Sequence, residues 1–296
     1  MNFKNYKLWT AVVTPLDDKG VVDFKAFEKT LRVQEAADVA VVVLGSTGEA
    51  LNLNDDEKRE IVKFATGLHL KVPMMVGLGG HNIDENKKWL AFLETQKIDC
   101  YLSVTPIYAK PGAAGQYLWF KELLDASTRS VMLYNVPSRS GVSLNYEAVT
   151  KLKDHKNFWA IKEASGKLED FKKYKSAAPN AAMFSGDDAL MPVFAKAGGV
   201  GLVSVASNVW PVETKKYVEM CLTNELAEDH AHLWEDCANA LFAASNPVPV
   251  KILMHKLGVI NSPLLRLPLS HLDLKDHSFL LTAHDRIKQW YKAVKK

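Results

Sequence analysis

The chain has 296 residues and a net charge of +3, and 48% of its residues are hydrophobic and 24% charged. This composition is typical of a globular protein with a large core, and the charge is too small to predict binding to nucleic acid or to an anionic membrane. Three cysteines without Cys-x-x-Cys spacing indicate a reducing compartment. The N-terminus lacks the apolar core of a signal peptide, and no apolar run approaches the ~18 residues of a membrane span. We therefore expect a soluble, cytoplasmic protein.

Eight short apolar runs alternate with helical patterns along the first three quarters of the chain. Continuous apolar runs are typical of strands buried on both faces, and their alternation with helices indicates parallel strands joined by crossover helices. Eight such units before residue 225 predict an α/β protein with a (β/α)8 TIM barrel rather than an open doubly wound sheet. The predicted strands are Leu8–Val13, Val39–Leu44, Pro73–Val76, Cys100–Val104, Val131–Tyr134, Phe158–Ile161, Ala181–Phe184 and Val200–Val203.

Two regions follow from this pattern. Residues 1–225 are expected to form the barrel, and residues 226–296 a C-terminal helical region packed on it. Prolines interrupt this second region, but its pattern otherwise predicts helix throughout.

The C-terminal ends of the predicted strands carry polar and glycine-rich segments. In barrels of this kind, the active site lies at these ends. The set includes an amine, two phenols, small hydroxyls and a guanidinium, but no pair of histidines at metal-binding spacing. This favours catalysis by an amine with proton relay and carboxylate binding, and predicts neither a metal nor a cofactor. The segments are Thr14, Gly45–Glu49, Gly77, Thr105–Tyr108, Tyr134–Gly141, Lys162, Gly186–Asp188 and Ser204.

Lys162 is the most informative of these residues because it directly follows the buried run Phe158–Ile161. An ammonium group taken out of water is costly unless it is paired or used. Burial favours the neutral amine, which is a nucleophile toward carbonyl compounds. A structural ion pair between Lys162 and a nearby carboxylate is the alternative.

The other candidates also have structural alternatives. Ser46 and Thr47 can cap a helix or tighten a turn, and Tyr134 can be a core tyrosine. Arg139 can form a surface ion pair. Asp187 and Asp188 are expected to cap the next helix.

Three segments resemble the dihydrodipicolinate synthase (4-hydroxy-tetrahydrodipicolinate synthase) family of pyruvate-dependent aldolases. They are Gly45–Glu49 (GSTGE), Tyr134–Gly141 (YNVPSRSG) and Ile161–Gly166 (IKEASG). The resemblance covers essentially the whole chain, including Asn246–Lys251 (NPVPVK) and Leu265–Pro268 (LRLP).

The resemblance implies that Lys162 forms a Schiff base with pyruvate, and that the resulting enamine attacks L-aspartate 4-semialdehyde in lysine and diaminopimelate biosynthesis. It implies a proton relay of Tyr134, Ser46 and Tyr108, with Tyr108 supplied by a neighbouring subunit. The enzyme would then be a homo-oligomer, and the family is commonly a homotetramer built from tight dimers.

The resemblance also assigns the binding residues. Thr47 and the amides of its turn would hold the pyruvate carboxylate, and Arg139 the carboxylate of the aldehyde, for which its planar fork is suited. Gly186 and Val203 would line the lysine pocket.

This sequence departs from the family's pattern at two places. Ser46 stands where threonine is usual, which keeps the hydroxyl. In the region where lysine inhibits many members, Ile107 replaces a tyrosine and Lys58 adds a positive charge, so we expect weak or absent inhibition by lysine. The matching positions are Ala50, Leu51, Asp55, Lys58, His81, Glu85 and Ile107.

Three other functions remain possible at this stage. N-acetylneuraminate lyase and 2-keto-3-deoxy-acid aldolase share the superfamily. Arg139 disfavours both, because a polyhydroxylated substrate is expected to be bound by neutral hydrogen-bonding groups at this position. A catalytically silent barrel is disfavoured by the presence of both Lys162 and Tyr134.

Overall fold

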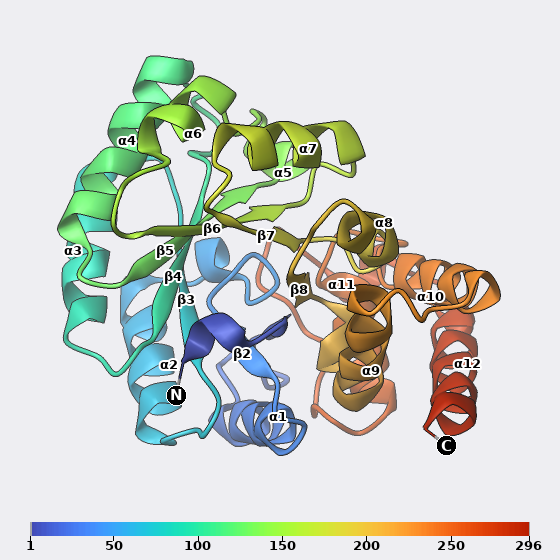
Figure 1. The fold of residues 1–296 in the computed structure, drawn as a ribbon. Helices are drawn as coiled ribbons and strands as arrows, with labels where there is room; N and C mark the ends of the chain where they lie inside the picture. Colours follow the sequence, from blue (N-terminus) through green and yellow to red (C-terminus); the bar gives the residue numbers. More distant parts are fainter. Residues whose placement is uncertain (1, 296) are drawn as a thin grey trace.

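Eight parallel strands close into a barrel in the computed structural model, which describes residues 2–295. Each strand pairs with its neighbours in chain order, and β1 pairs with β8 to close the barrel (Figure 1). The predicted (β/α)8 barrel is confirmed. The strands are β1 (Leu8–Ala11), β2 (Ala40–Val43), β3 (Met74–Leu78), β4 (Cys100–Val104), β5 (Ser130–Asn135), β6 (Phe158–Glu163), β7 (Ala182–Ser185) and β8 (Gly201–Ser204).

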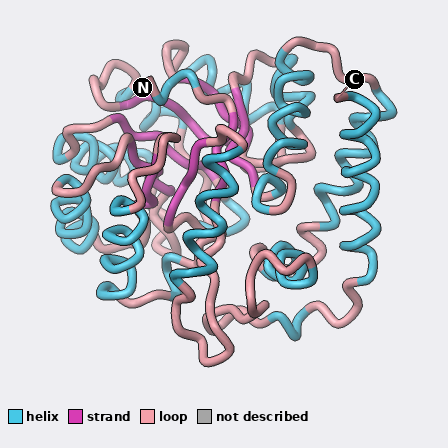
Figure 2. The backbone as a smooth tube through the Cα atoms, turned by 90° about the horizontal axis from the view of Figure 1, so that it is seen from below, coloured by secondary structure: helices cyan, strands magenta, loops and turns pink. Residues whose placement is uncertain are grey.

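Helices connect the strands and surround them, as Figure 2 shows from below. The sequence explains where two of them begin, because Asp23 accepts a hydrogen bond from Ala26 N and Asn54 forms a capping box with Glu57. The helices are α1 (Phe24–Ala36), α2 (Asp55–Gly67), α3 (Ile83–Glu94), α4 (Ala113–Ala126), α5 (Pro137–Ser140), α6 (Tyr146–Leu152), α7 (Leu168–Ala177), α8 (Met191–Lys196) and α9 (Pro211–Leu222).

The core has two layers because strand side chains alternate between the faces of the sheet. One set fills the barrel, including Trp9, Met75 and Met132. Phe3 and Trp159 pack edge to face at the N-terminal end, with ring centroids 5.0 Å apart. The other set packs between strands and helices. The barrel interior is therefore packed with side chains, which leaves the opposite end for a site.

The C-terminal region contributes α10 (Glu228–Ala240), α11 (Val248–Lys256) and α12 (Ser278–Val294). In Figure 1, α10 and α12 lie outside the barrel beside α9. Trp234 on α10 stacks on Tyr217 of α9 at 4.2 Å and meets Trp290 of α12 edge to face at 5.1 Å. None of the helices among residues 2–295 is long and apolar enough to cross a membrane.

The expectation that this region is helical throughout is wrong between α11 and α12. Residues 257–277 contain only a short 3-10 helix, His271–Asp273. Pro263 and Pro268 lack the backbone N–H that a helix needs. Arg266 instead donates its backbone N–H to Glu49, 2.7 Å away, so this segment bonds to the barrel.

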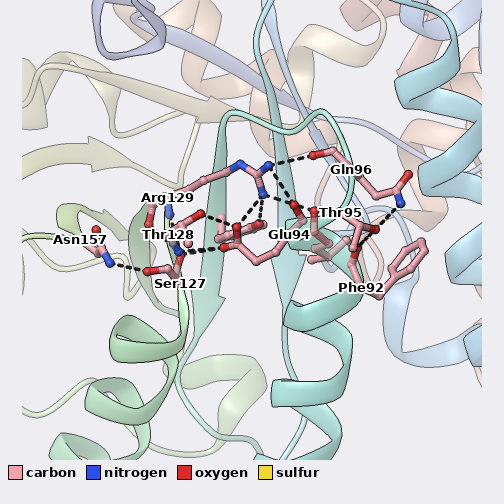
Figure 3. A network of polar contacts seen from close by, with 10 residues as sticks. Phe92, Glu94, Thr95, Gln96, Ser127, Thr128, Arg129 and Asn157 are labelled. Carbon is pink, nitrogen blue, oxygen red and sulfur yellow. Dashed lines mark hydrogen bonds and ion pairs between the residues drawn. The ribbon is translucent and has the colours of Figure 1, made fainter.

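At the N-terminal end of β5, Arg129 is the centre of a polar network (Figure 3). Its guanidinium donates to the Glu94 carboxylate at 3.1 Å and to the Tyr101 hydroxyl at 2.6 Å. It also donates to the backbone carbonyls of Leu93, Glu94 and Gln96, at the C-terminal end of α3. One side chain thus adds a donor to three carbonyls at the helix end, where intrahelical donors run out.

We predict that Arg129→Ala lowers the free energy of unfolding by about 2–3 kcal/mol, because it removes a half-buried guanidinium that donates to three backbone carbonyls, a carboxylate and a hydroxyl. Urea-induced unfolding measures this. Arg286→Ala is the matched control, since the Arg286–Asp236 pair is solvent-exposed and should contribute less than about 1 kcal/mol. Equal losses in the two variants would contradict the prediction.

Candidate active site

Lys162 lies at the C-terminal end of β6, inside the barrel, with only 5% of its surface exposed. Its Nζ is 4.2 Å from the centre of the Tyr134 ring. Among residues 2–295, no Asp or Glu oxygen lies within 4.0 Å of Lys162 Nζ. The alternative of a structural ion pair is therefore wrong. The amine is therefore buried and not tied to a carboxylate of the described residues.

Strand pairing brings Tyr134 to Lys162. The two residues are partners in the parallel register of β5 and β6. Because side chains at paired positions project from the same face of a sheet, both enter the barrel. Val203 on β8 belongs to the same buried cluster as Tyr134.

Gly186 lies directly against the lysine, as expected. A Cβ at this position would be 2.7 Å from Lys162 Cε and 2.7 Å from Ala164 Cβ, which is shorter than any ordinary contact. Only a glycine leaves room for the lysine side chain in its observed position.

A cavity of about 610 Å³ opens at this end of the barrel. Ser46, Tyr134 and Arg139 line it. Lys162 is not part of the lining and adjoins the cavity through Tyr134. The cavity also reaches most of the positions matched to lysine inhibition: Ala50, Leu51, Asp55, Lys58, Glu85 and Ile107.

The Gly45–Glu49 turn is held rigidly. Thr14 donates its hydroxyl to Gly48 O at 2.7 Å, and the buried Thr47 hydroxyl accepts from Asn246 Nδ2 at 2.9 Å. A Cβ at Gly48 would lie 3.1 Å from Val12 O, so any larger residue would crowd the backbone at this turn. Neither Ser46 nor Thr47 caps α2, whose N-cap is Asn54, so the capping alternative is wrong.

A buried ion pair fixes the end of this turn. Glu49, which has a left-handed φ of 56°, pairs with Lys251 of α11 at 2.8 Å, and both side chains are buried. Lys251 Nζ also donates to Thr14 O at 3.0 Å. Burial lowers the pKa of Lys251, and the Glu49 carboxylate opposes that shift. Sequence reasoning missed this role, although a lysine among the apolar residues of Pro247–Lys251 was a signal.

Asn246 is a second residue that sequence reasoning did not place in the site. Its side chain donates to Thr47, and its carbonyl accepts from Arg139 Nη2 at 2.9 Å. Arg139 forms no ion pair with the carboxylates of residues 2–295, so the surface ion pair proposed as its alternative is wrong. Asn246 therefore connects the two residues predicted to bind carboxylates.

Tyr108 is not brought to Lys162 within one chain. It is 90% exposed, has a φ of 66°, and donates its backbone N–H to Ser140 O at 3.1 Å. The chain thus places this phenol on the surface next to α5.

Asp187 and Asp188 do not cap α8, whose N-cap is Leu190, so that expectation is wrong. The buried Asp188 carboxylate accepts from the Ser204 hydroxyl at 2.5 Å and from Val205 N at 2.9 Å, just after β8. Burial raises the pKa of Asp188 to about 6. Asp187 accepts from Ala189 N at 3.0 Å. The Asp188 carboxylate thus ties the segment after β7 to the end of β8.

The model of the dihydrodipicolinate synthetase family matches residues 4–285. The chain belongs to this family. The 4-hydroxy-tetrahydrodipicolinate synthase of Francisella tularensis subsp. novicida is 46% identical over 98% of each chain. That of Wolbachia pipientis subsp. Culex pipiens is 44% identical over 97% of this chain and 98% of the relative.

Solved structures of the same family have the same fold as this chain. A dihydrodipicolinate synthase from Acinetobacter baumannii, described as chloride-inhibited and complexed with pyruvate, has a TM-score of 0.89 at 28% identity over 96% of this chain and 99% of its own. The 4-hydroxy-tetrahydrodipicolinate synthase of Methylacidiphilum fumariolicum has a TM-score of 0.90 at 30% identity over 98% of each chain. The synthase function and the lyase class expected from the sequence are confirmed at the level of the family.

We predict that Gly186→Ala lowers kcat by about 100-fold, because the new methyl group must displace the Lys162 side chain by the order of 1 Å. A steady-state assay of pyruvate condensation measures this. Gly67→Ala is the control, since a Cβ at Gly67 meets nothing within 4 Å. A native kcat in Gly186→Ala would show that the pocket tolerates the displacement.

Proposed function

We propose that this chain condenses pyruvate with L-aspartate 4-semialdehyde through a Schiff base on Lys162. The observation that carries the proposal is a buried lysine beside Tyr134, with no carboxylate partner among residues 2–295. Such an amine attacks a ketone, and the iminium formed on loss of water accepts electrons from the neighbouring carbon. Loss of a methyl proton then gives the enamine, whose carbon attacks the aldehyde. The amino group of the aldehyde substrate then attacks the iminium carbon, and proton transfer to Nζ expels the free lysine amine together with the cyclic product.

Each of these steps moves protons, so the site needs groups that donate and accept them. Tyr134 and Ser46 supply hydroxyls at the cavity wall. Tyr108 would complete the relay from a second subunit, which its 90% exposure in its own chain allows. We therefore propose at least a dimer, and a homotetramer built from two such dimers. One structural neighbour is described as a monomeric dihydrodipicolinate synthase variant, so the family's fold does not itself require assembly.

Two carboxylates have to be held during the reaction. Thr47 and the amides of its turn are proposed to bind the carboxylate of pyruvate, and Arg139 that of the aldehyde. Asn246 contacts both residues and so fixes their relative position. Gly186 and Val203 complete the pocket around the lysine.

We place this reaction in the cytoplasm, in the synthesis of lysine and diaminopimelate. We also propose the division of the chain into a barrel (residues 1–225) and a helical region (226–296). The buried Glu49–Lys251 pair then joins the second part to the site in the first.

We predict that Lys162→Ala abolishes both the borohydride-trapped pyruvate adduct and turnover, the latter by roughly 10³-fold or more, because no other amine replaces the nucleophile. Mass spectrometry of the trapped protein locates the adduct, and a coupled reductase assay gives the rate. Lys167→Ala, at an exposed lysine in the loop that follows β6, is the control and should keep both.

If pyruvate forms an adduct at Lys162 but the synthase reaction does not turn over, the Schiff base at Lys162 is supported and the assignment of aspartate semialdehyde as the second substrate is wrong. Higher activity on N-acetylneuraminate than on aspartate semialdehyde would replace the proposal by the lyase alternative.

We also propose that lysine inhibits this enzyme weakly or not at all. The cavity region matched to lysine binding already contains an ammonium group: Lys58 Nζ lies 2.5 Å from Asp55 and 5.6 Å from the Trp89 ring. A second cation there meets repulsion from Lys58. Glu85 lines the same region and is the remaining carboxylate among the matched positions.

Turnover should therefore stay within about twofold of its starting value when millimolar L-lysine is added, because the repulsion opposes binding. The coupled assay at fixed pyruvate and aldehyde measures this. The variant Lys58→Ala should be at least as sensitive to lysine as the native enzyme. Strong inhibition of the native enzyme by sub-millimolar lysine would refute the proposal.

A further inference from the structure

Next to the catalytic pair lies a second pair that the mechanism does not use. Asn135 follows Tyr134 on β5, and Glu163 follows Lys162 on β6. Both are fully buried, and they are partners in the strand register. Asn135 Nδ2 donates to Glu163 Oε2 at 2.7 Å. Because successive side chains alternate, this pair lies on the outer face of the strands while Tyr134 and Lys162 enter the barrel.

The remaining acceptors of this pair are also occupied. Asn135 Oδ1 accepts from Leu144 N at 2.8 Å, and Glu163 Oε1 accepts from Ser165 N at 2.5 Å. The first bond holds the segment that follows Arg139. The second fixes the turn that follows Lys162.

The backbone groups of the same two residues extend these connections. Asn135 O accepts from Ala164 N at 2.9 Å, and Glu163 O accepts from Gly186 N at 2.7 Å. Gly186 is the residue against the Lys162 side chain. The pair therefore joins the ends of β5 and β6, and Glu163 continues the connection to the end of β7.

Glu163 has no cation as partner: among residues 2–295, no Lys, Arg or His nitrogen lies within 4.0 Å of its carboxylate. Burial raises its pKa, and the bonds from Ser165 and Asn135 oppose that shift. An apolar residue would avoid the cost of burying this carboxylate. The carboxylate instead accepts two directed hydrogen bonds, one from Asn135 on β5 and one from Ser165 in the turn after β6.

We propose that Asn135 and Glu163 are positioning residues that hold the Tyr134 phenol against the Lys162 amine. This inference rests on the proposed roles of Lys162 and Tyr134. Asn135 and Glu163 each follow one of these two residues in sequence, and they act by fixing the register and separation of the ends of β5 and β6. Displacements of the order of 1 Å between reacting groups reduce rates by about 100-fold, so the strand ends need such a restraint.

The donors and acceptors of the pair define a sharp test. Glu163→Gln turns one of its two acceptors into a donor, which must then face the N–H of either Ser165 or Asn135. Asn135→Asp brings a second carboxylate against Glu163. The double substitution Asn135→Asp/Glu163→Gln satisfies every group again. The carboxylate at 135 accepts from Leu144 N and from the new amide at 163, whose oxygen accepts from Ser165 N.

The measurement is the rate of pyruvate adduct formation at Lys162, trapped by borohydride, together with kcat and the KM for pyruvate. Each single substitution should slow adduct formation and kcat by about 10- to 100-fold, with KM changed by less than about threefold, since Thr47 is not displaced. The double variant should recover most of the loss, because the two changes are strongly coupled.

A merely structural role gives a different result. Leu152→Ala on α6, a buried residue of the outer core, lowers stability without touching the pair and should leave the adduct rate of the folded enzyme unchanged. Urea unfolding of every variant provides the comparison. Single variants that lose stability but form the adduct at the native rate, or a double variant that recovers nothing, would overturn the proposal.

A second variant at Glu163 and the adduct of the native enzyme complete the test. If Glu163→Gln does not fold, Glu163→Asp retains the charge and both acceptors but withdraws them by one methylene group. It should slow adduct formation, and a native rate would overturn the inference. Native enzyme that forms no adduct at Lys162 would refute the proposed function itself, whereas a native adduct with unaffected single variants would refute only the positioning role.

Discussion

The pairing of β5 with β6 is the constraint on which the rest of the site depends. It places Tyr134 opposite Lys162 inside the barrel and Asn135 opposite Glu163 outside it. Because a shift of one residue in a strand exchanges its two faces, this register cannot slip without removing the amine from the cavity end. The positions of the buried amine, the phenol and the buried hydrogen-bonded pair therefore follow from one alignment of two strands.

Charge is distributed around this alignment in a consistent way. The carboxylate of Glu163 lies next to the amine in sequence but on the other face of the sheet, so it does not form an ion pair with Lys162. Glu49, by contrast, pairs with Lys251 and holds the turn that carries Thr47. Removing either partner of such a buried pair leaves an uncompensated charge. Of these two buried lysines, Lys251 is paired with a carboxylate, whereas Lys162, the proposed nucleophile, lies over the Tyr134 ring.

The two ends of the barrel serve different purposes. At the N-terminal end, Arg129 satisfies helix carbonyls and a carboxylate, and aromatic side chains fill the opening. At the C-terminal end, glycines at 48 and 186 leave space for backbone and for Lys162. The segment from Asn246 to Arg266 crosses to this end and bonds to Thr47, Arg139 and Glu49. The C-terminal region is therefore part of the site and not only an addition to the barrel.

The sequence by itself determined the class of fold, because eight apolar runs of strand length alternating with helical patterns have few other solutions. It also predicted that Lys162, Tyr134, Ser46 and Arg139 lie at the same end of the barrel, since strand ends meet at one edge of a parallel barrel. Local caps at Asp23 and Asn54 were predictable because they depend on neighbours in sequence. The tertiary structure alone decided the partners of charged and polar groups. Within residues 2–295 Lys162 forms no ion pair, Lys251 pairs with Glu49, and Asp188 bonds to Val205 just after β8 rather than to its own helix. These partners are far apart in the chain, and only the closed barrel brings them within hydrogen-bonding distance.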